Sequence, residues 1–154
     1  MLNINETAPN FAAADQVNNP IQLNDYLGKQ KVVLYFYPKD DTPGCTIEAN
    51  DFTRLISEFA AANTKVIGVS KDDCTSHQAF IDKFDLKVDL LADIEGTTCE
   101  AYGVWQLKEK NGVSKMGIVR STFIIDLEGK LAYVEYGVNP DGHALAMLEK
   151  VKEI

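Results

Sequence analysis

The chain has 154 residues, of which 45% are hydrophobic and 25% charged, which is the size and composition of one globular domain. Its 23 acidic and 15 basic residues give a net charge of -8, so we expect neither nucleic acid nor a membrane surface as a partner. The longest uninterrupted apolar run, Val32–Tyr37, is far shorter than the roughly 20 residues that a membrane span needs.

The chain contains three cysteines, too few and too odd a number for a disulfide scaffold. Its first residues, MLNINETAPNF, lack the basic and apolar segments of a secretory signal. We therefore expect one domain over residues 1–154, located in the cytoplasm, with free thiols that are available for chemistry.

Strand-like and helix-like segments alternate along the chain. Residues 1–30 are expected to form an N-terminal extension with short strands around Phe11–Ala14 and Ile21–Leu23. The elements expected after it are a strand at Lys31–Tyr37, a helix at about 44–62, a strand at Lys65–Ser70, a helix at Ser76–Phe84, a strand at Val88–Leu91, a short helix at Glu95–Tyr102, a hairpin of strands Ile118–Asp126 and Lys130–Tyr136, and a closing helix from about Pro140. This order predicts an α/β fold in which helices flank a mixed sheet.

Apolar spacing indicates which helix faces are buried. In the first long helix the apolar residues recur at i, i+3, i+4 and i+7, which predicts one continuous amphipathic helix with the buried face Phe52, Leu55, Ile56 and Phe59. The closing helix is expected to bury Leu145, Leu148 and Val151.

The segment PKDDTPGC, Pro38–Cys45, follows a strand and opens a helix, which is where open α/β sheets place their ligand sites. Cys45 is expected in the first helical turn, where free N–H groups and the helix dipole favour an anion. Since only the thiolate is nucleophilic, this position predicts a reactive cysteine. Thr42 lies three residues upstream, within reach of the sulfur, and Glu48 lies three residues downstream on the same helix face. The alternative is an inert apolar cysteine at a helix start.

Arg120, one of only two arginines, is expected inside the apolar strand GIVRSTFII. A guanidinium in such a place needs a buried anion to offset its desolvation. The thiolate of Cys45 is one candidate, with Glu48 orienting the guanidinium, and an arginine on a strand edge is the alternative. Forming the thiolate raises the amount of nucleophile by only about 30-fold, so the same donors must also stabilise the transition state.

PKDDTPGC resembles the PxxxTxxC signature of peroxiredoxins, through Pro38, Thr42 and Cys45. The surrounding YFYPKDDTPGCTIEA and the later AYGVW and RSTFIID are similar to the peroxiredoxin Q branch, also called bacterioferritin comigratory protein. The similarity extends from about Ala8 to the C-terminus. It implies a thioredoxin-like fold and the thiol-dependent reduction of hydrogen peroxide and organic hydroperoxides, with no cofactor.

The resemblance also implies a role for each residue of the motif. Cys45 would be the peroxidatic cysteine, which attacks one peroxide oxygen and becomes a sulfenic acid. Thr42 would hydrogen-bond the sulfur and the peroxide, and Arg120 would stabilise the thiolate and polarise the O–O bond. Pro38 would shield the pocket, and Glu48 would position the arginine.

The resolving thiol does not follow the pattern of this branch, because Asn50 and Ile81 occupy its two usual positions. The remaining thiols, Cys74 and Cys99, match neither position. The sulfenic acid is therefore expected to meet either one of these thiols or an external one from thioredoxin, glutaredoxin or glutathione. A monomer is expected, with a weak dimer as the alternative.

Two other classes of function stay open at this point. A thioredoxin-like thiol–disulfide oxidoreductase normally carries CxxC, but Glu48 stands where the second cysteine would be. A peroxide-sensing thiol protein would be oxidised without rapid turnover.

The remaining polar and aromatic candidates are assigned to surface or core. Cys74 and His77 have a CxxH spacing, but no second ligand pair exists, so no metal is expected. His77 and His143 are predicted to be solvent-exposed. Tyr102 and Trp105 are predicted to lie in the core.

Overall fold

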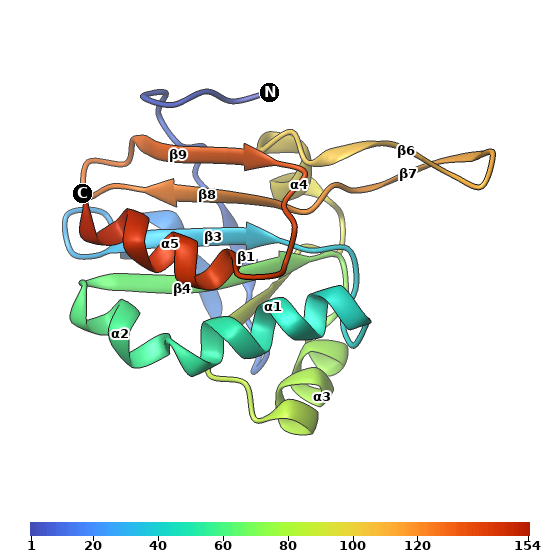
Figure 1. The fold of residues 1–154 in the computed structure, drawn as a ribbon, viewed down its shortest axis with the longest axis horizontal. Coiled ribbons are helices and arrows are strands. Elements are labelled where there is room, and N and C mark those ends of the chain that lie inside the picture. Colours follow the sequence, from blue (N-terminus) through green and yellow to red (C-terminus); the bar gives the residue numbers. More distant parts are fainter.

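The computed structural model describes all 154 residues of the chain. Figure 1 shows a central sheet with helices packed against it and a hairpin that projects from one side. None of the helices combines the length and the apolar character needed to cross a bilayer. The elements are, in chain order, β1 Ala12–Ala14, β2 Pro20–Gln22, a 3-10 helix at Leu23–Asp25, β3 Lys31–Phe36, α1 Pro43–Arg54, α2 Ile56–Ala61, β4 Thr64–Ser70, α3 Cys74–Phe84, β5 Asp89–Ala92, α4 Thr97–Ala101, β6 Trp105–Lys110, β7 Val113–Ile118, β8 Ser121–Ile125, β9 Leu131–Tyr136 and α5 His143–Lys152.

Seven strands form one mixed sheet in the order β2-β1-β5-β4-β3-β8-β9, while β6 pairs only with β7. β3, β4 and β5 are parallel and are joined by helical crossovers, whereas the other neighbours in the sheet are antiparallel. The predicted mixed sheet flanked by helices is therefore confirmed. The two N-terminal strands pair with each other and reach β5, so this segment extends the sheet.

The sheet separates two apolar layers, and β3 contributes to both. Val33 and Tyr35 face the layer beneath α1, α2, α3 and α5. Val32 and Leu34 face the opposite layer, which includes α4 and the N-terminal segment. Successive side chains of a strand point to opposite faces, so a strand buried on both sides is apolar throughout. This explains the continuous apolar run at the start of the reactive segment.

The prediction of one continuous helix over residues 44–62 is wrong. Leu55 has φ -100° and ψ 6°, and it ends α1 and precedes α2. The N–H of Leu55 is shared among the carbonyls of three preceding residues, which is typical of a helix terminus. Phe52 and Phe59 are both fully buried on either side of the break. The apolar spacing therefore survives the interruption, which is why periodicity did not reveal it.

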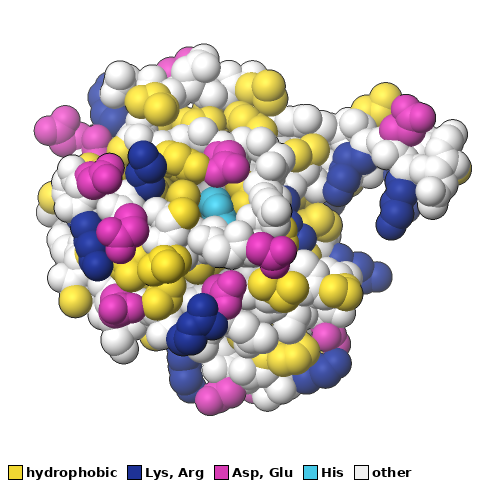
Figure 2. All heavy atoms as spheres, viewed as in Figure 1, with side chains coloured by type: hydrophobic (Ala, Val, Ile, Leu, Met, Phe, Trp, Pro, Cys, Tyr) yellow, Lys and Arg dark blue, Asp and Glu magenta, His cyan; other side chains and the backbone are white.

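The sequence analysis missed the β6–β7 hairpin, which stands off the body of the molecule in Figure 1 and Figure 2. Its turn residues Asn111 and Gly112 have φ values of 54° and 77°, as a type I′ turn requires. Residues 107–116 are all exposed. Because most of the hairpin is exposed, its apolar alternation is limited to one or two residues on each strand. The sequence signal that could have found it is the Asn111-Gly112 pair.

The buried face of α5 also differs from the prediction. Leu145 is 55% exposed, whereas Leu148 and Val151 are buried together with Ala144 and Met147. Residues 144, 147, 148 and 151 follow the i, i+3, i+4, i+7 spacing of one helix face. The predicted positions 145, 148 and 151 are instead three residues apart. Because an α-helix has 3.6 residues per turn, such a row of side chains rotates around the helix, and Leu145 points to solvent.

Both histidines were predicted to be exposed, and both are buried, at 0% for His77 and 6% for His143. Each has a polar partner in the interior: Nε2 of His143 lies 2.8 Å from the Thr122 hydroxyl, and His77 joins the network described below. Of the two predicted core aromatics, Tyr102 is fully buried and Trp105 is half-buried.

Candidate active site

The reactive segment connects β3 to α1. Thr42 is the N-cap residue of α1 and Pro43 is its first helical residue, a position where proline is well tolerated. The first hydrogen bond of the helix runs from the N–H of Thr46 to the carbonyl of Thr42, at 2.9 Å. The N–H groups of Gly44 and Cys45 precede it, so they are free to meet an anion.

Cys45, Glu48 and Arg120 come together in the structure. Nη2 of Arg120 donates to Sγ of Cys45 at 3.3 Å, and Nη1 donates to Oε1 of Glu48 at 2.6 Å. Cys45 is 1% exposed, and the side chain of Glu48 is 0% exposed. One guanidinium therefore bridges a buried sulfur and a buried carboxyl that lie three residues apart on α1.

Arg120 lies in the link between β7 and β8, and not inside a strand as expected. Ile118 still pairs within the hairpin, whereas Ser121 already pairs with Phe36 in the main sheet. The chain thus changes from one sheet to the other at Arg120, so its side chain is free to turn toward α1. The carbonyl of Arg120 accepts hydrogen bonds from the N–H groups of Gly137 and Val138, and these bonds hold the link in place.

Burial dominates the electrostatics of Glu48. It raises the pKa of this carboxyl from 4.5 to about 7, against the opposing effect of Arg120. Oε2 of Glu48 has no hydrogen-bond partner, and neither has the buried hydroxyl of Tyr35. Burial alone would lower the pKa of Arg120, but the negative charges of Glu48 and Cys45 raise it.

The two other motif residues, Thr42 and Pro38, form no hydrogen bond with the Cys45 sulfur. The hydroxyl of Thr42 donates to the carbonyl of Lys39 at 2.9 Å and not to Cys45. Pro38 is exposed and lines the outer groove beside the hairpin. The structure therefore brings Cys45, Glu48 and Arg120 into direct contact, and it places Thr42 and Pro38 in the loop that precedes them.

The two candidate resolving cysteines are held apart from the site in different ways. Cys99 is fully buried in the apolar layer on one face of the sheet, whereas Cys45 belongs to the layer on the other face. Burial, followed by a hydrogen bond with Asp93, raises the pKa of the Cys99 thiol well above its usual value. Cys74 is half-buried at the start of α3, with its sulfur 4.0 Å from Oδ1 of Asn18. All three thiols are free.

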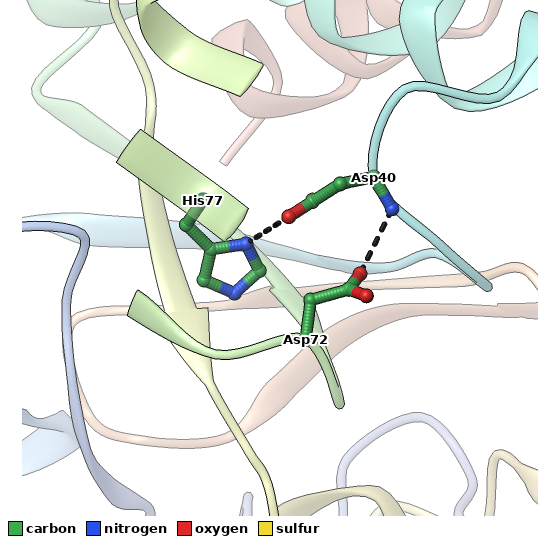
Figure 3. A group of neighbouring side chains, drawn as sticks. All are labelled: Asp40, Asp72 and His77. Atoms are coloured by element: carbon green, nitrogen blue, oxygen red, sulfur yellow. Dashed lines mark hydrogen bonds and ion pairs between the residues drawn. The ribbon is translucent and has the colours of Figure 1, made fainter. Parts of the chain in front are cut away.

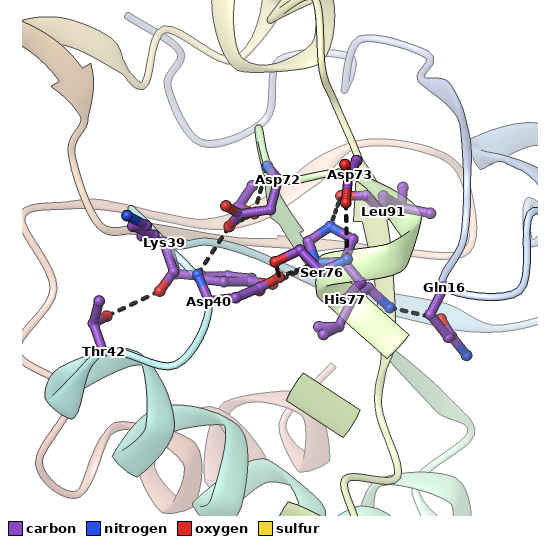
Figure 4. A network of polar contacts seen from close by, with 12 residues as sticks. Gln16, Lys39, Asp40, Thr42, Asp72, Asp73, Ser76, His77 and Leu91 are labelled. Carbon is purple, nitrogen blue, oxygen red and sulfur yellow. Dashed lines mark hydrogen bonds and ion pairs between the residues drawn. The ribbon is translucent and has the colours of Figure 1, made fainter. Parts of the chain in front are cut away.

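A buried polar network that sequence reasoning missed fixes the loop before Cys45 (Figure 3). Oδ2 of Asp40 lies 2.8 Å from Nδ1 of His77 on α3 and accepts from the hydroxyl of Ser76 at 2.7 Å. Oδ1 accepts from the hydroxyl of Tyr37 at 2.5 Å, and the N–H of Asp40 donates to Asp72 at 2.8 Å. Figure 4 shows these side chains converging on the loop from the strand ends and α3. The loop is therefore tied to α3 and to the connection between β4 and α3.

Both ring nitrogens of His77 lie beside hydrogen-bond acceptors. Nδ1 faces the carboxylate of Asp40, and Nε2 lies 2.9 Å from the carbonyl oxygen of Leu91. Both partners are acceptors, so the ring is placed to donate a hydrogen bond from either nitrogen. Burial alone would raise the pKa of Asp40, but hydrogen bonds from His77 and Tyr37 lower it. Asp40 and His77 thus form a buried ion pair.

The side chains of Asp40, Asp72 and His77 lie close enough to suggest a metal site. However, the facing atoms are used in hydrogen bonds: Nδ1 of His77 donates to Asp40, and Oδ2 of Asp72 accepts from the hydroxyl of Ser70 at 2.7 Å. In the sequence, the CxxH spacing associated His77 with Cys74. Its real partner is the first aspartate of the DD pair in the reactive loop.

The arrangement around Cys45 suits an attack on a two-oxygen substrate. The guanidinium of Arg120 contacts the sulfur, and the free N–H groups of Gly44 and Cys45 lie in the same first turn of α1 as the sulfur. These donors can stabilise the thiolate and the negative charge that develops on a leaving oxygen. The geometry therefore supports nucleophilic cleavage of an oxygen–oxygen bond.

Comparison with known proteins gives the same indication. The chain matches the AhpC/TSA family over residues 4–134. It is 41% identical over 153 residues to peroxiredoxin Bcp of Bacillus subtilis, covering 99% of this chain and 97% of that protein. It is 36% identical over 152 residues to peroxiredoxin Bcp of Escherichia coli, covering 99% of this chain and 97% of that protein.

Solved structures with this fold include two close matches. Peroxiredoxin Q of Xanthomonas campestris superposes with a TM-score of 0.88 at 36% identity, covering 93% of this chain and 90% of that chain. PrxQ of Xylella fastidiosa superposes with a TM-score of 0.93 at 34% identity, covering 99% of this chain and 97% of that chain. The similarity extends over nearly the whole length of each protein.

Proposed function

This chain belongs to the AhpC/TSA family and is a thiol-dependent peroxidase of the peroxiredoxin Bcp, or peroxiredoxin Q, type, and we propose that Cys45 is its peroxidatic residue. The observation that carries this assignment is the Arg120 guanidinium, 3.3 Å from the Cys45 sulfur and held on its other side by Glu48. A cation in that position favours the thiolate over the thiol. Neither Cys74 nor Cys99 has an arginine or lysine among its hydrogen-bond partners.

The proposed reaction begins with attack of the Cys45 thiolate on one oxygen of a hydroperoxide. The O–O bond breaks, and the sulfur keeps that oxygen as a sulfenic acid. The second oxygen leaves with the bonding electrons and takes a proton from water, which gives an alcohol, or water when the substrate is hydrogen peroxide. Arg120 and the N–H groups of Gly44 and Cys45 stabilise the two oxygens along the line of attack.

We propose supporting roles for the other motif residues. In its ionised form Glu48 fixes the guanidinium of Arg120 against the sulfur. The hydroxyl of Thr42 reaches the substrate by turning away from the carbonyl of Lys39, which lies within the same loop. Pro38 stiffens this loop and limits the access of water.

We propose a one-cysteine cycle, in which an external thiol reduces the sulfenic acid. Cys99 is fully buried on the other side of the sheet from Cys45, and a disulfide between them would require the core to open. An attacking thiolate from outside forms a mixed disulfide and releases the sulfenic oxygen as water. A second thiol of the reductant then attacks the mixed disulfide, forms the reductant's own disulfide and restores Cys45. In thioredoxin or glutaredoxin this thiol belongs to the same protein, and with glutathione it comes from a second molecule.

We further propose that residues 1–154 form one domain, because the seven-stranded sheet includes both the first strand, β1, and the last strand, β9. The proposed setting is a monomer in the cytoplasm, consistent with three free thiols. The proposed substrates are hydrogen peroxide and organic hydroperoxides. A solved structure of the related bacterioferritin comigratory protein of Xanthomonas campestris concerns alkyl peroxide reduction.

The test is peroxide consumption with dithiothreitol as the thiol donor. We expect Cys45→Ser to abolish turnover, and Cys74→Ser and Cys99→Ser to retain it. Equal losses in all three variants would contradict the assignment of Cys45. Reduction of insulin without peroxide turnover would favour a thiol–disulfide oxidoreductase. Oxidation of one equivalent without further turnover would favour a peroxide sensor.

Mass spectrometry after one equivalent of peroxide tests the one-cysteine cycle. We expect the added oxygen to remain on Cys45 as a sulfenic acid, which a second equivalent of peroxide would convert to a sulfinic acid. A disulfide between Cys45 and either Cys74 or Cys99 would replace this cycle with an intramolecular one.

A further inference from the structure

A groove of about 750 Å³ lies beside the projecting β6–β7 hairpin, and Figure 2 shows basic side chains on the edge of the hairpin that faces the body. No acidic residue is among the 12 that line it. Five of them are lysines: Lys39, Lys71, Lys108, Lys110 and Lys115. A third of the 15 basic residues of an acidic protein are therefore gathered along one groove. We call it the lysine groove.

The positive charge of the lysine groove is not neutralised within the chain. Lys108 and Lys115 are direct cross-strand partners, and Lys110 lies two residues along on the same face of the hairpin. Like charges placed opposite each other destabilise a strand pair. None of the five lysines forms an ion pair with an acidic side chain. Lys71 lies over the ring of Trp105 at 4.0 Å, and Lys108 donates to a backbone carbonyl.

Both walls of the lysine groove lead into the active site. Pro38 and Lys39 line it from one side, and the same loop continues to Cys45. Gly117 and Ile118 line it from the other side, and that segment continues to Arg120. A molecule that lies in the groove therefore contacts the two segments that continue to Cys45 and to Arg120.

Exposed apolar side chains accompany the charge. Val113 and Met116, which also line the groove, are 65% and 43% exposed. Protein interfaces combine apolar contacts of this kind with a charged rim that guides association. The hairpin also stands off the body, so its lysines can reach across a broad partner surface and not only a small molecule (Figure 1).

We propose that the lysine groove is the docking surface for an acidic dithiol protein that reduces Cys45. This inference rests on the proposed one-cysteine cycle, in which the reductant comes from outside. The docked protein supplies two thiols and two electrons: its first thiolate displaces the sulfenic oxygen as water, and its second closes its own disulfide and releases the Cys45 thiolate. Charge on the hairpin speeds the encounter without taking part in the reaction with peroxide.

The experiment compares Lys108→Gln/Lys115→Gln with a control of equal charge change, Lys29→Gln/Lys152→Gln. The control lysines are exposed and lie near the opposite end of β3. Peroxide turnover of each variant is measured with dithiothreitol, and then with an acidic thioredoxin kept reduced by its reductase. We expect the groove variant to lose about tenfold in kcat/KM for the thioredoxin, the low end of electrostatic steering, and the control to lose little. The wild-type value is expected to fall with added salt and to approach that of the groove variant.

Several outcomes would overturn the proposal. An unchanged kcat/KM for thioredoxin in the groove variant would show that the lysines do not dock it. Loss of turnover with dithiothreitol in this variant alone would show that the lysines act on the peroxide reaction or on the fold. A wild-type dimer that the groove variant abolishes would assign the groove to a second copy of the chain. Failure of the wild-type protein to reduce peroxide with either thiol would instead refute the proposed function.

Discussion

Replacing Glu48 by glutamine tests the electrostatics of the site most directly. Glutamine has nearly the same shape, and its carbonyl oxygen still accepts the hydrogen bond from Nη1 of Arg120. The substitution therefore removes one buried charge while the packing of α1 is retained. The carboxyl it removes has its pKa raised from 4.5 to about 7 by burial, against the opposing effect of Arg120.

The direction and size of the effect follow from this pKa. The folded chain holds the Glu48 proton more tightly than the unfolded chain, so the contribution of Glu48 to stability falls as the pH rises from 4.5 to about 7. At about 1.4 kcal/mol per pKa unit, the full penalty above pH 7 is about 3 kcal/mol. We therefore expect Glu48→Gln to match the wild type in acid and to be about 3 kcal/mol more stable above pH 7, relative to that baseline.

The assay is urea unfolding of the reduced wild-type and Glu48→Gln proteins at several pH values between 4 and 8. The difference between their free energies of unfolding isolates Glu48, because all other titrating groups are common to both. Peroxide turnover is measured alongside, and the variant is expected to be slower above pH 7, where only the wild type has an anion to hold Arg120. A difference in stability that does not change with pH would refute the reasoning.

Three further predictions concern packing and charge around the site. At Gly44 a Cβ atom would lie 3.0 Å from Nη2 of Arg120, so Gly44→Ala is expected to displace the guanidinium. Peroxide reduction, measured by stopped flow, should slow about tenfold, which is a barrier increase of about 1.4 kcal/mol. A rate equal to that of the wild type would contradict this prediction. At Gly68 a Cβ atom would lie 2.7 Å from the ring of Tyr35, so Gly68→Ala is expected to destabilise the fold by about 1–3 kcal/mol in urea unfolding, and a neutral result would mean that the ring has room to move. His77→Gln leaves Asp40 buried without its cation and is expected to cost about 3–5 kcal/mol, whereas adding Asp40→Asn should restore part of the loss; additive losses in this double-mutant cycle would show that the two residues are not an ion pair.

Local sequence was sufficient to locate the reactive segment. A strand buried on both faces, a turn-rich loop and a helix that begins with proline are each encoded within a few neighbouring residues. The position of Cys45 in the first turn of α1, with Glu48 one turn further, follows from helix geometry alone. The same is true of the alternating strands and helices, which predicted the mixed sheet.

Sequence patterns identified the elements with a weak buried face less well. The strands of the β6–β7 hairpin are exposed over most of their length, so their apolar alternation is short, and the Asn111-Gly112 turn was the signal that could have identified them. The break at Leu55 leaves the apolar spacing of its neighbours intact, and the face of α5 was assigned from a stripe that drifts around the helix. In each of these cases the apolar spacing of the sequence is compatible with more than one backbone conformation.

Tertiary structure alone decided which distant groups meet. Arg120 contacts Cys45 across 75 residues, and His77 contacts Asp40 across 37 residues. The scarcity of arginine and the apolar residues around Arg120 made it a candidate partner of Cys45, whereas nothing in spacing or composition indicated that His77 meets Asp40. Both contacts depend on how α1, α3 and the end of the hairpin pack over the sheet. The sequence by itself therefore determined which residue can act as the nucleophile. The tertiary structure decided that Arg120 contacts this nucleophile and does not lie on a strand edge, and it decided which buried ion pair holds the loop. Contacts between distant segments form only when both elements pack on the same surface.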